Sequence, residues 1–127
     1  MKKKILIVIA DYYKDISPTL LSSAKTNLKN FSLKIIKVPG VFEIPVTISK
    51  NIKKYDAFIA LGCVIKGETP HFDFISSATT NSIMDLSIHS KKPIGNGIIT
   101  CLNKKQARAR GDKGKEAAMA VVSVLSQ

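Results

Sequence analysis

The chain of 127 residues has no tryptophan, only two cysteines and no apolar run that approaches the length of a membrane span. Cys63 and Cys101 lie in different segments without metal-ligand spacing, which argues against a metal site. The apolar stretch after Met1–Lys4 is only about six residues long and stops at Asp11, too short for a secretory signal. We therefore expect one soluble, cytoplasmic domain, residues 1–127, with no metal, no disulfide and no membrane partner.

Acidic residues are also scarce: the chain has nine Asp and Glu against 20 Lys and Arg, which gives a net charge of +11. Residues 1–54 and 91–127 carry the excess, and residues 55–90 hold one Lys against four acids. Most of the positive charge is lysine spread over expected helix and loop surfaces with few aromatics between, which is typical of solvated faces. We expect no nucleic-acid partner, although such a surface would attract phosphorylated small molecules.

Apolar, β-branched runs alternate with helical patterns along the chain. Strands are expected at residues 5–10, 33–38, 57–61 and 94–100, and the pattern after each run favours a helix. Ser17 and Thr69 each precede a proline, which predicts that their hydroxyls cap helix N-termini. The βαβαβαβα order predicts an α/β fold with a four-stranded parallel sheet and helices on both faces.

The stretch from Ala60 to Phe74 is the most informative in the chain. It leaves the third expected strand, passes two glycines and brings His71 to a helix start. Ligands bind beyond the carboxyl ends of parallel strands, and a helix start offers free N–H groups to an anion. A histidine there can transfer protons near neutral pH, although a lone surface histidine is often only solvated. His89, at a helix end, fits a capping or solvated role.

Two further segments place candidate ligand-binding residues at the same edge of the sheet. Phe42 and Glu43 follow the second strand beside a glycine turn, where Phe42 could stack on a planar heterocycle and Glu43 could hydrogen-bond it. Tyr12, at the end of the first strand, contributes to the same edge. Ordinary core packing of Phe42 and a helix-start charge for Glu43 remain open alternatives. A basic cluster around Arg110 follows the fourth strand and suits a phosphate, or forms a solvated helix face.

Three segments, residues 39–45, 62–73 and 93–100, resemble the motifs of the 6,7-dimethyl-8-ribityllumazine synthase family. The resemblance extends from about Ile5 to the last helix. It implies a flavodoxin-like three-layer sandwich and a transferase of riboflavin biosynthesis that needs no cofactor. The reaction implied is condensation of 5-amino-6-(D-ribitylamino)uracil with 3,4-dihydroxy-2-butanone 4-phosphate, through Schiff-base formation, phosphate loss and ring closure.

The resemblance also assigns residue roles. His71 would transfer protons. The substrate-binding residues would be Tyr12, Val41, Phe42, Glu43, Cys63, Val64, Ile65, Glu68, Thr69, Asn96 and Arg110. Glu68 and Thr69 would meet the butanone phosphate, and Cys63, Val64 and Ile65 would line one pocket. In the family, the residues matching Asn96 and Arg110 come from the adjacent subunit of a homopentamer.

The chain also departs from the family pattern. The N-terminal strand that many members donate to a neighbour is absent, which favours a plain pentamer over a larger assembly. The segment after Arg110 is shorter than usual, which leaves open whether Lys113 joins the site. Riboflavin synthase is a further candidate partner. A non-catalytic flavin-, lumazine- or RNA-binding protein of the same fold is the alternative, and the presence of both Glu43 and His71 favours catalysis.

Overall fold

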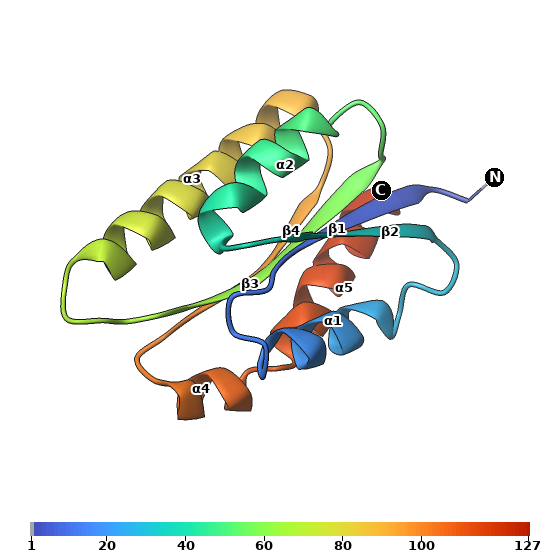
Figure 1. The fold of residues 1–127 in the computed structure, drawn as a ribbon. Coiled ribbons are helices and arrows are strands. Elements are labelled where there is room, and N and C mark those ends of the chain that lie inside the picture. The colour runs from blue at the N-terminus through green and yellow to red at the C-terminus, as the bar shows by residue number, and fades with distance from the viewer. Residues whose placement is uncertain (1) are drawn as a thin grey trace.

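The computed structural model describes residues 2–127 and contains one parallel sheet between two layers of helices (Figure 1). The strands are β1 (Lys4–Ala10), β2 (Ser32–Val38), β3 (Ala57–Ile65) and β4 (Ile94–Cys101), in the order β2-β1-β3-β4. The helices are α1 (Ser17–Lys25), the short 3-10 helix η1 (Val41–Glu43), α2 (Ile44–Lys50), α3 (His71–Ser90), α4 (Lys104–Ala109) and α5 (Lys113–Leu125). The predicted α/β sandwich is confirmed.

The strand order decides which helices share a face. The chain steps from β1 outward to β2, then returns past β1 to β3 and continues to β4. Because crossovers between parallel strands are right-handed, this reversal puts α1 on one face and α2 and α3 on the other (Figure 1). Helix α5 joins α1 on its face, and the two helices pack against each other. The reversal point, where such folds bind ligands, lies between β1 and β3 at their carboxyl ends.

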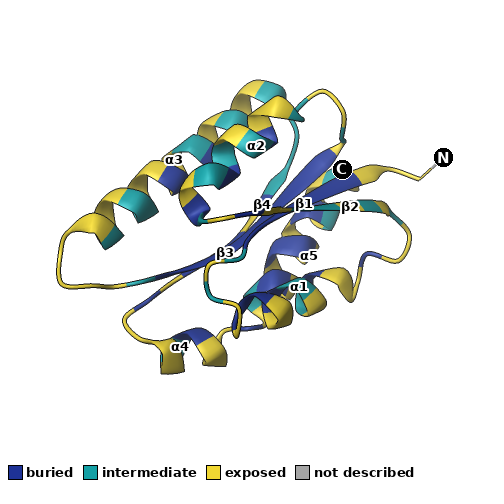
Figure 2. Cartoon of the chain, viewed as in Figure 1, coloured by how far each residue is buried: buried dark blue, intermediate teal, exposed yellow. Residues whose placement is uncertain are grey.

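The two central strands form the core because helices cover both of their faces. Every residue from Ile5 to Ala10 is buried, as is every residue from Ala57 to Val64 (Figure 2). Side chains alternate between the faces, so that Ile7 packs with α1 and α5 whereas Val8 packs with α2. This explains why the sequence of β1 is a continuous apolar run rather than an alternating one.

Three local expectations need correction. Strand β3 runs to Ile65, four residues beyond the predicted end at Leu61. Ser17 is not an N-cap: it is the first residue of α1, and its buried hydroxyl donates to the carbonyl oxygens of Ala10 (3.2 Å) and Tyr13 (3.0 Å). Helix α3 begins at His71, so Thr69 lies just before the cap position and accepts a long hydrogen bond from the His71 N–H (3.4 Å).

Within the described residues, no helix combines the length and the apolar character that crossing a membrane requires.

Candidate active site

Strand β3 has an unpaired edge at its carboxyl end. Strand β3 pairs with β1 only as far as Leu61, whereas it pairs with β4 as far as Ile65. The backbone of Gly62–Ile65 therefore has no strand beside it on the β1 side. Free peptide N–H and C=O groups at such an edge can hydrogen-bond a planar heterocycle that offers complementary groups. We call this site, with η1 and the loop after β1 around it, the crevice.

One wall of the crevice is set by the contact between η1 and Gly62. The side chain of Val41 is buried against β3, and a Cβ on Gly62 would lie 2.6 Å from Val41 Cγ1 and 3.1 Å from Ala10 Cβ. Glycine at this position therefore allows η1 to lie directly on the strand. The turn leaves Phe42 62% exposed and Glu43 partly exposed, with the Glu43 N–H donating to the Gly40 carbonyl at 3.2 Å.

Phe42 and Glu43 share a hollow with the middle of α3. It has a volume of about 400 Å³ and is lined by Phe42, Glu43, Pro45, Val46, Ala78, Thr79 and Ser82. The hydroxyl of Thr79 is buried and finds no hydrogen-bond partner in the described part of the chain. The sequence analysis missed this contribution from α3. A polar residue at a core-facing helix position is the signal that could have revealed it.

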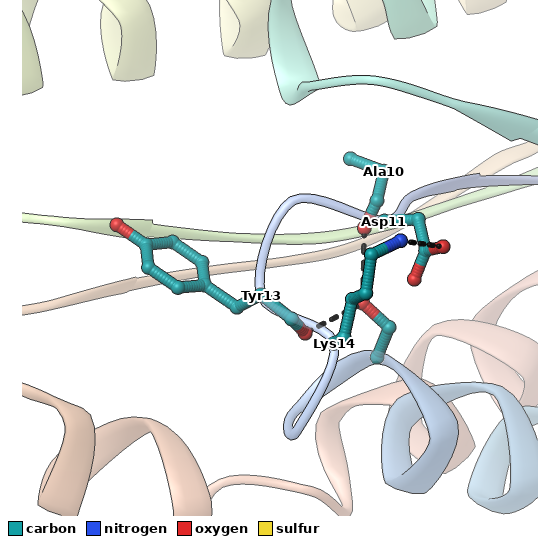
Figure 3. Close-up of polar contacts among 5 residues, drawn as sticks. Ala10, Asp11, Tyr13 and Lys14 are labelled. Carbon is teal, nitrogen blue, oxygen red and sulfur yellow. Dashed lines mark hydrogen bonds and ion pairs between the residues drawn. The ribbon is translucent and has the colours of Figure 1, made fainter.

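The loop after β1 presents Tyr12 to solvent and holds Tyr13 inward. Tyr12 is 72% exposed and packs edge-to-face on Tyr13, with ring centroids 4.9 Å apart. Partial burial, and then the neighbouring Cys63, raise the pKa of Tyr13. Asp11 accepts from the Lys14 ammonium at 3.1 Å, which lowers the pKa of Asp11, and the Tyr13 ring points away from that pair (Figure 3). Tyr12 is thus the aromatic ring of this loop that is free to stack on a ligand.

The three residues expected to line one pocket from β3 do not share a face. Cys63 and Ile65 pack on the side of α1 and α4, whereas Val64 packs with Val41 on the side of α2 and α3. The alternation of side chains along a strand requires this division, so their shared contribution to the crevice is backbone. Burial raises the pKa of Cys63 to about 12, so this residue stays a neutral thiol and is no nucleophile at neutral pH.

His71 lies at the open end of α3. It is exposed, as are Glu68 and Thr69 in the preceding loop, while the Lys66 N–H donates to the Cys101 carbonyl at 2.9 Å and fixes the start of that loop. At the start of this 20-residue helix the His71 N–H donates to Thr69 and the Asp73 N–H to the Pro70 carbonyl (3.0 Å), so the positive end of the helix dipole is what favours a phosphate next to the imidazole.

Asn96 and Arg110 lie at the outer edge of β4, which we call the β4 edge. The Asn96 side chain is exposed and accepts from the Ile98 N–H at 3.0 Å. Arg110 follows α4, and its guanidinium donates to the Thr100 carbonyl (3.1 Å) and lies 3.8 Å from Cys101 Sγ. Arg110 lines a hollow of about 470 Å³ together with Lys113 and Glu116. Lys113, whose place in the site the sequence did not decide, therefore lies beside Arg110.

The structure therefore gathers the predicted residues into groups rather than into one pocket. The hollow of Phe42 and Glu43 and the hollow of Arg110 and Lys113 have no lining residue in common. His71 lines neither of them. Across residues 2–127, no group of three or more His, Cys, Asp or Glu side chains is arranged to hold a metal ion.

Comparison with known proteins identifies the family. The family model described as 6,7-dimethyl-8-ribityllumazine synthase matches residues 2–127. The chain is 44% identical to the 6,7-dimethyl-8-ribityllumazine synthase of Bartonella bacilliformis, over 88% of this chain and 78% of that protein. It is 41% identical to the synthase of Agrobacterium fabrum, over 98% of this chain and 93% of that protein. The chain belongs to the 6,7-dimethyl-8-ribityllumazine synthase family.

Proposed function

We propose that this chain is the transferase that condenses 5-amino-6-(D-ribitylamino)uracil with 3,4-dihydroxy-2-butanone 4-phosphate to 6,7-dimethyl-8-ribityllumazine, the penultimate step of riboflavin biosynthesis. The match of the family model to residues 2–127 carries this proposal. The exposed ring of Phe42, the carboxylate of Glu43 and the imidazole of His71, all at the carboxyl side of the sheet, support it.

Each chemical step has a candidate group in this chain. The amine of the pyrimidine attacks the butanone carbonyl, and loss of water from the adduct gives a Schiff base, which requires protons to move. His71, exposed beside the start of α3, is placed to shuttle them. The phosphate then leaves by elimination, for which the positive N-terminal end of α3 and the guanidinium of Arg110 supply charge stabilisation. Elimination also removes the proton on C3 and leaves an enol, which tautomerises to a new carbonyl. Attack of the ribitylamino nitrogen on this carbonyl, with loss of water, closes the ring.

We propose that the active site forms between two subunits of a homopentamer. Arg110 and Lys113 lie in a hollow separate from that of Phe42 and Glu43, so one chain alone does not enclose both substrates. Strand β4 is an edge strand with an open side, and such edges are commonly covered in the assembled protein. Light scattering combined with the activity assay tests this proposal, and a fully active monomer would refute it.

We further propose that residues 1–127 act as a single domain in the cytoplasm. Cys63 and Cys101 are buried thiols in different segments, and the reducing conditions of the cytoplasm keep such thiols free. Riboflavin synthase, which consumes the product, is the proposed partner enzyme.

The direct test is product formation. The purified protein is incubated with both substrates, and lumazine fluorescence is followed against the uncatalysed reaction and against the protein with either substrate alone. We expect a rate well above the background. A rate equal to the background would mean that the chain binds flavin or lumazine without catalysis.

A further inference from the structure

Helix α4 is weakly attached to the rest of the fold. It has only six residues, too few to be stable by itself, and Ala107 is its only buried residue. Its first turn is fixed by Asn103, whose side chain accepts from the Gln106 N–H at 2.9 Å. Arg110 follows its last residue directly, so any movement of α4 shifts the backbone that carries the guanidinium that we assign to the phosphate.

Polar contacts tie α4 to the loop after β1. Asp15 Oδ2 lies 3.0 Å from Arg108 Nη2 and 3.8 Å from Lys104 Nζ, and both cations are on α4. The Lys104 ammonium also lies 5.8 Å from the centroid of the Tyr13 ring. The hydrogen bond from Arg108, more than any other contact, lowers the pKa of Asp15. Asp15 is thus a single carboxylate that bridges two cations one helical turn apart.

The loop on the other side of this bridge is held independently of it. Ile16 is buried, and the Ser17 hydroxyl bonds two carbonyl oxygens of the loop. Loss of the bridge would therefore leave the loop in place and release α4. We propose that Asp15 is a positioning residue that, through Arg108 and Lys104, holds α4 so that Arg110 meets the substrate phosphate in the neighbouring subunit's site. This inference rests on the proposed function of Arg110.

Asp15→Asn distinguishes loss of the bridge from the long-range electrostatic effect of removing a charge, because the two change phosphate affinity in opposite directions. Removing the negative charge that faces the cations of α4 would, by electrostatics alone, strengthen phosphate binding. Loss of the bridge would weaken it. The expected result is a rise in KM for the butanone phosphate of about two- to fivefold, the scale of an exposed ion pair, with kcat and the KM for the pyrimidine nearly unchanged.

The experiment measures both KM values and kcat for the parent, Asp15→Asn, Arg108→Gln and the double variant. The double variant should be no worse than the more affected single one, because both remove the same interaction. Asp11→Asn is the matched control, since it removes a negative charge and breaks the 3.1 Å Asp11–Lys14 ion pair in the same loop without touching α4. An unchanged or lower KM in Asp15→Asn, or an equal rise in Asp11→Asn, would overturn the proposal.

Measuring the affinity for inorganic phosphate tests the role of Asp15 without relying on enzymatic activity. Phosphorus NMR titration should show weaker phosphate binding to Asp15→Asn than to the parent by the same factor. If the parent made no lumazine, the proposed function would fail, and this titration would still decide for or against the positioning role. Equal phosphate affinity in the two proteins would reject it.

Discussion

The crevice and the β4 edge are built in different ways. In the crevice, Val41 packs on Gly62 inside the hydrophobic core, so the wall that carries Phe42 and Glu43 is fixed by close apolar contact. At the β4 edge, Arg110 is held by hydrogen bonds to the strand end and by a short helix with one buried residue. This difference supports the proposal that the crevice is complete within one chain, whereas the β4 edge supplies groups to a second chain. The following variants test that division, from the largest expected effect to the smallest.

Arg110→Ala should give the largest effect. Loss of a charge-assisted hydrogen bond to phosphate costs about 1.5–3 kcal/mol, so KM for the butanone phosphate should rise roughly ten- to a hundredfold. The KM for ribitylaminouracil should barely move, because the crevice is untouched. Lys115→Ala on α5 removes the same charge without altering the Arg110 hollow and serves as the control. A comparable rise in KM for the pyrimidine would place Arg110 inside the crevice.

His71→Ala should lower kcat by about tenfold or somewhat more, with the affinity for the pyrimidine nearly intact. General acid–base groups often contribute a hundredfold or more, but this condensation also proceeds without enzyme, which limits the loss. His89→Ala is the matched control, since His89 Nδ1 only contacts the Asp85 carbonyl at 2.8 Å near the far end of α3. Equal losses in pyrimidine binding and turnover would instead give His71 a purely structural role.

Gly62→Ala should destabilise the protein by about 1–3 kcal/mol, because the new Cβ forces Val41 away from β3. Pyrimidine binding should weaken as η1 shifts, while inhibition by inorganic phosphate at the β4 edge should persist. Gly67→Ala is the control, since a Cβ there meets no atom within 4 Å. Urea unfolding of both variants measures the difference in stability. Equal unfolding midpoints would show that Val41 of η1 does not pack directly on Gly62.

Ser17→Ala should cost about 1 kcal/mol, since the single hydroxyl donor that the Ala10 and Tyr13 carbonyls share is lost. Because this loop carries Tyr12, the KM for ribitylaminouracil should rise slightly, with no change for the butanone phosphate. Ser123→Ala on the exposed side of α5 is the control, and thermal unfolding is the measurement. A selective effect on the butanone phosphate would contradict the assignment of this loop to the crevice.

The sequence predicts the fold well because its strands are continuous apolar runs separated by helix-start signals. It ends β3 too early, since Gly62 resembles the beginning of a loop, whereas the structure uses it as the place where Val41 contacts the strand. The error on Ser17 has a similar origin. A serine before proline usually caps a helix, but here the hydroxyl points back to the preceding loop.

The candidate site is only partly predictable. The motifs place His71, Phe42 and Glu43 correctly at the carboxyl side of the sheet, because parallel strands deliver their loops to one edge. They cannot show that Val64 faces away from Cys63 once β3 is extended, or that Asp15 meets a residue 93 positions later in the chain. Such contacts depend on how helices pack on the sheet, which no local pattern records.

The central claim, that each active site joins the crevice of one subunit to the β4 edge of another, is tested most directly by complementation. The His71→Ala and Arg110→Ala proteins, both expected to be weak when the butanone phosphate is well below its KM, are dissociated, mixed in equal amounts, reassembled and assayed under that condition. In a closed ring with random order, about a quarter of the interfaces pair an intact His71 with an intact Arg110, so activity should recover toward a quarter of the parent value. Activity equal to the mean of the two separate variants would contradict a shared site.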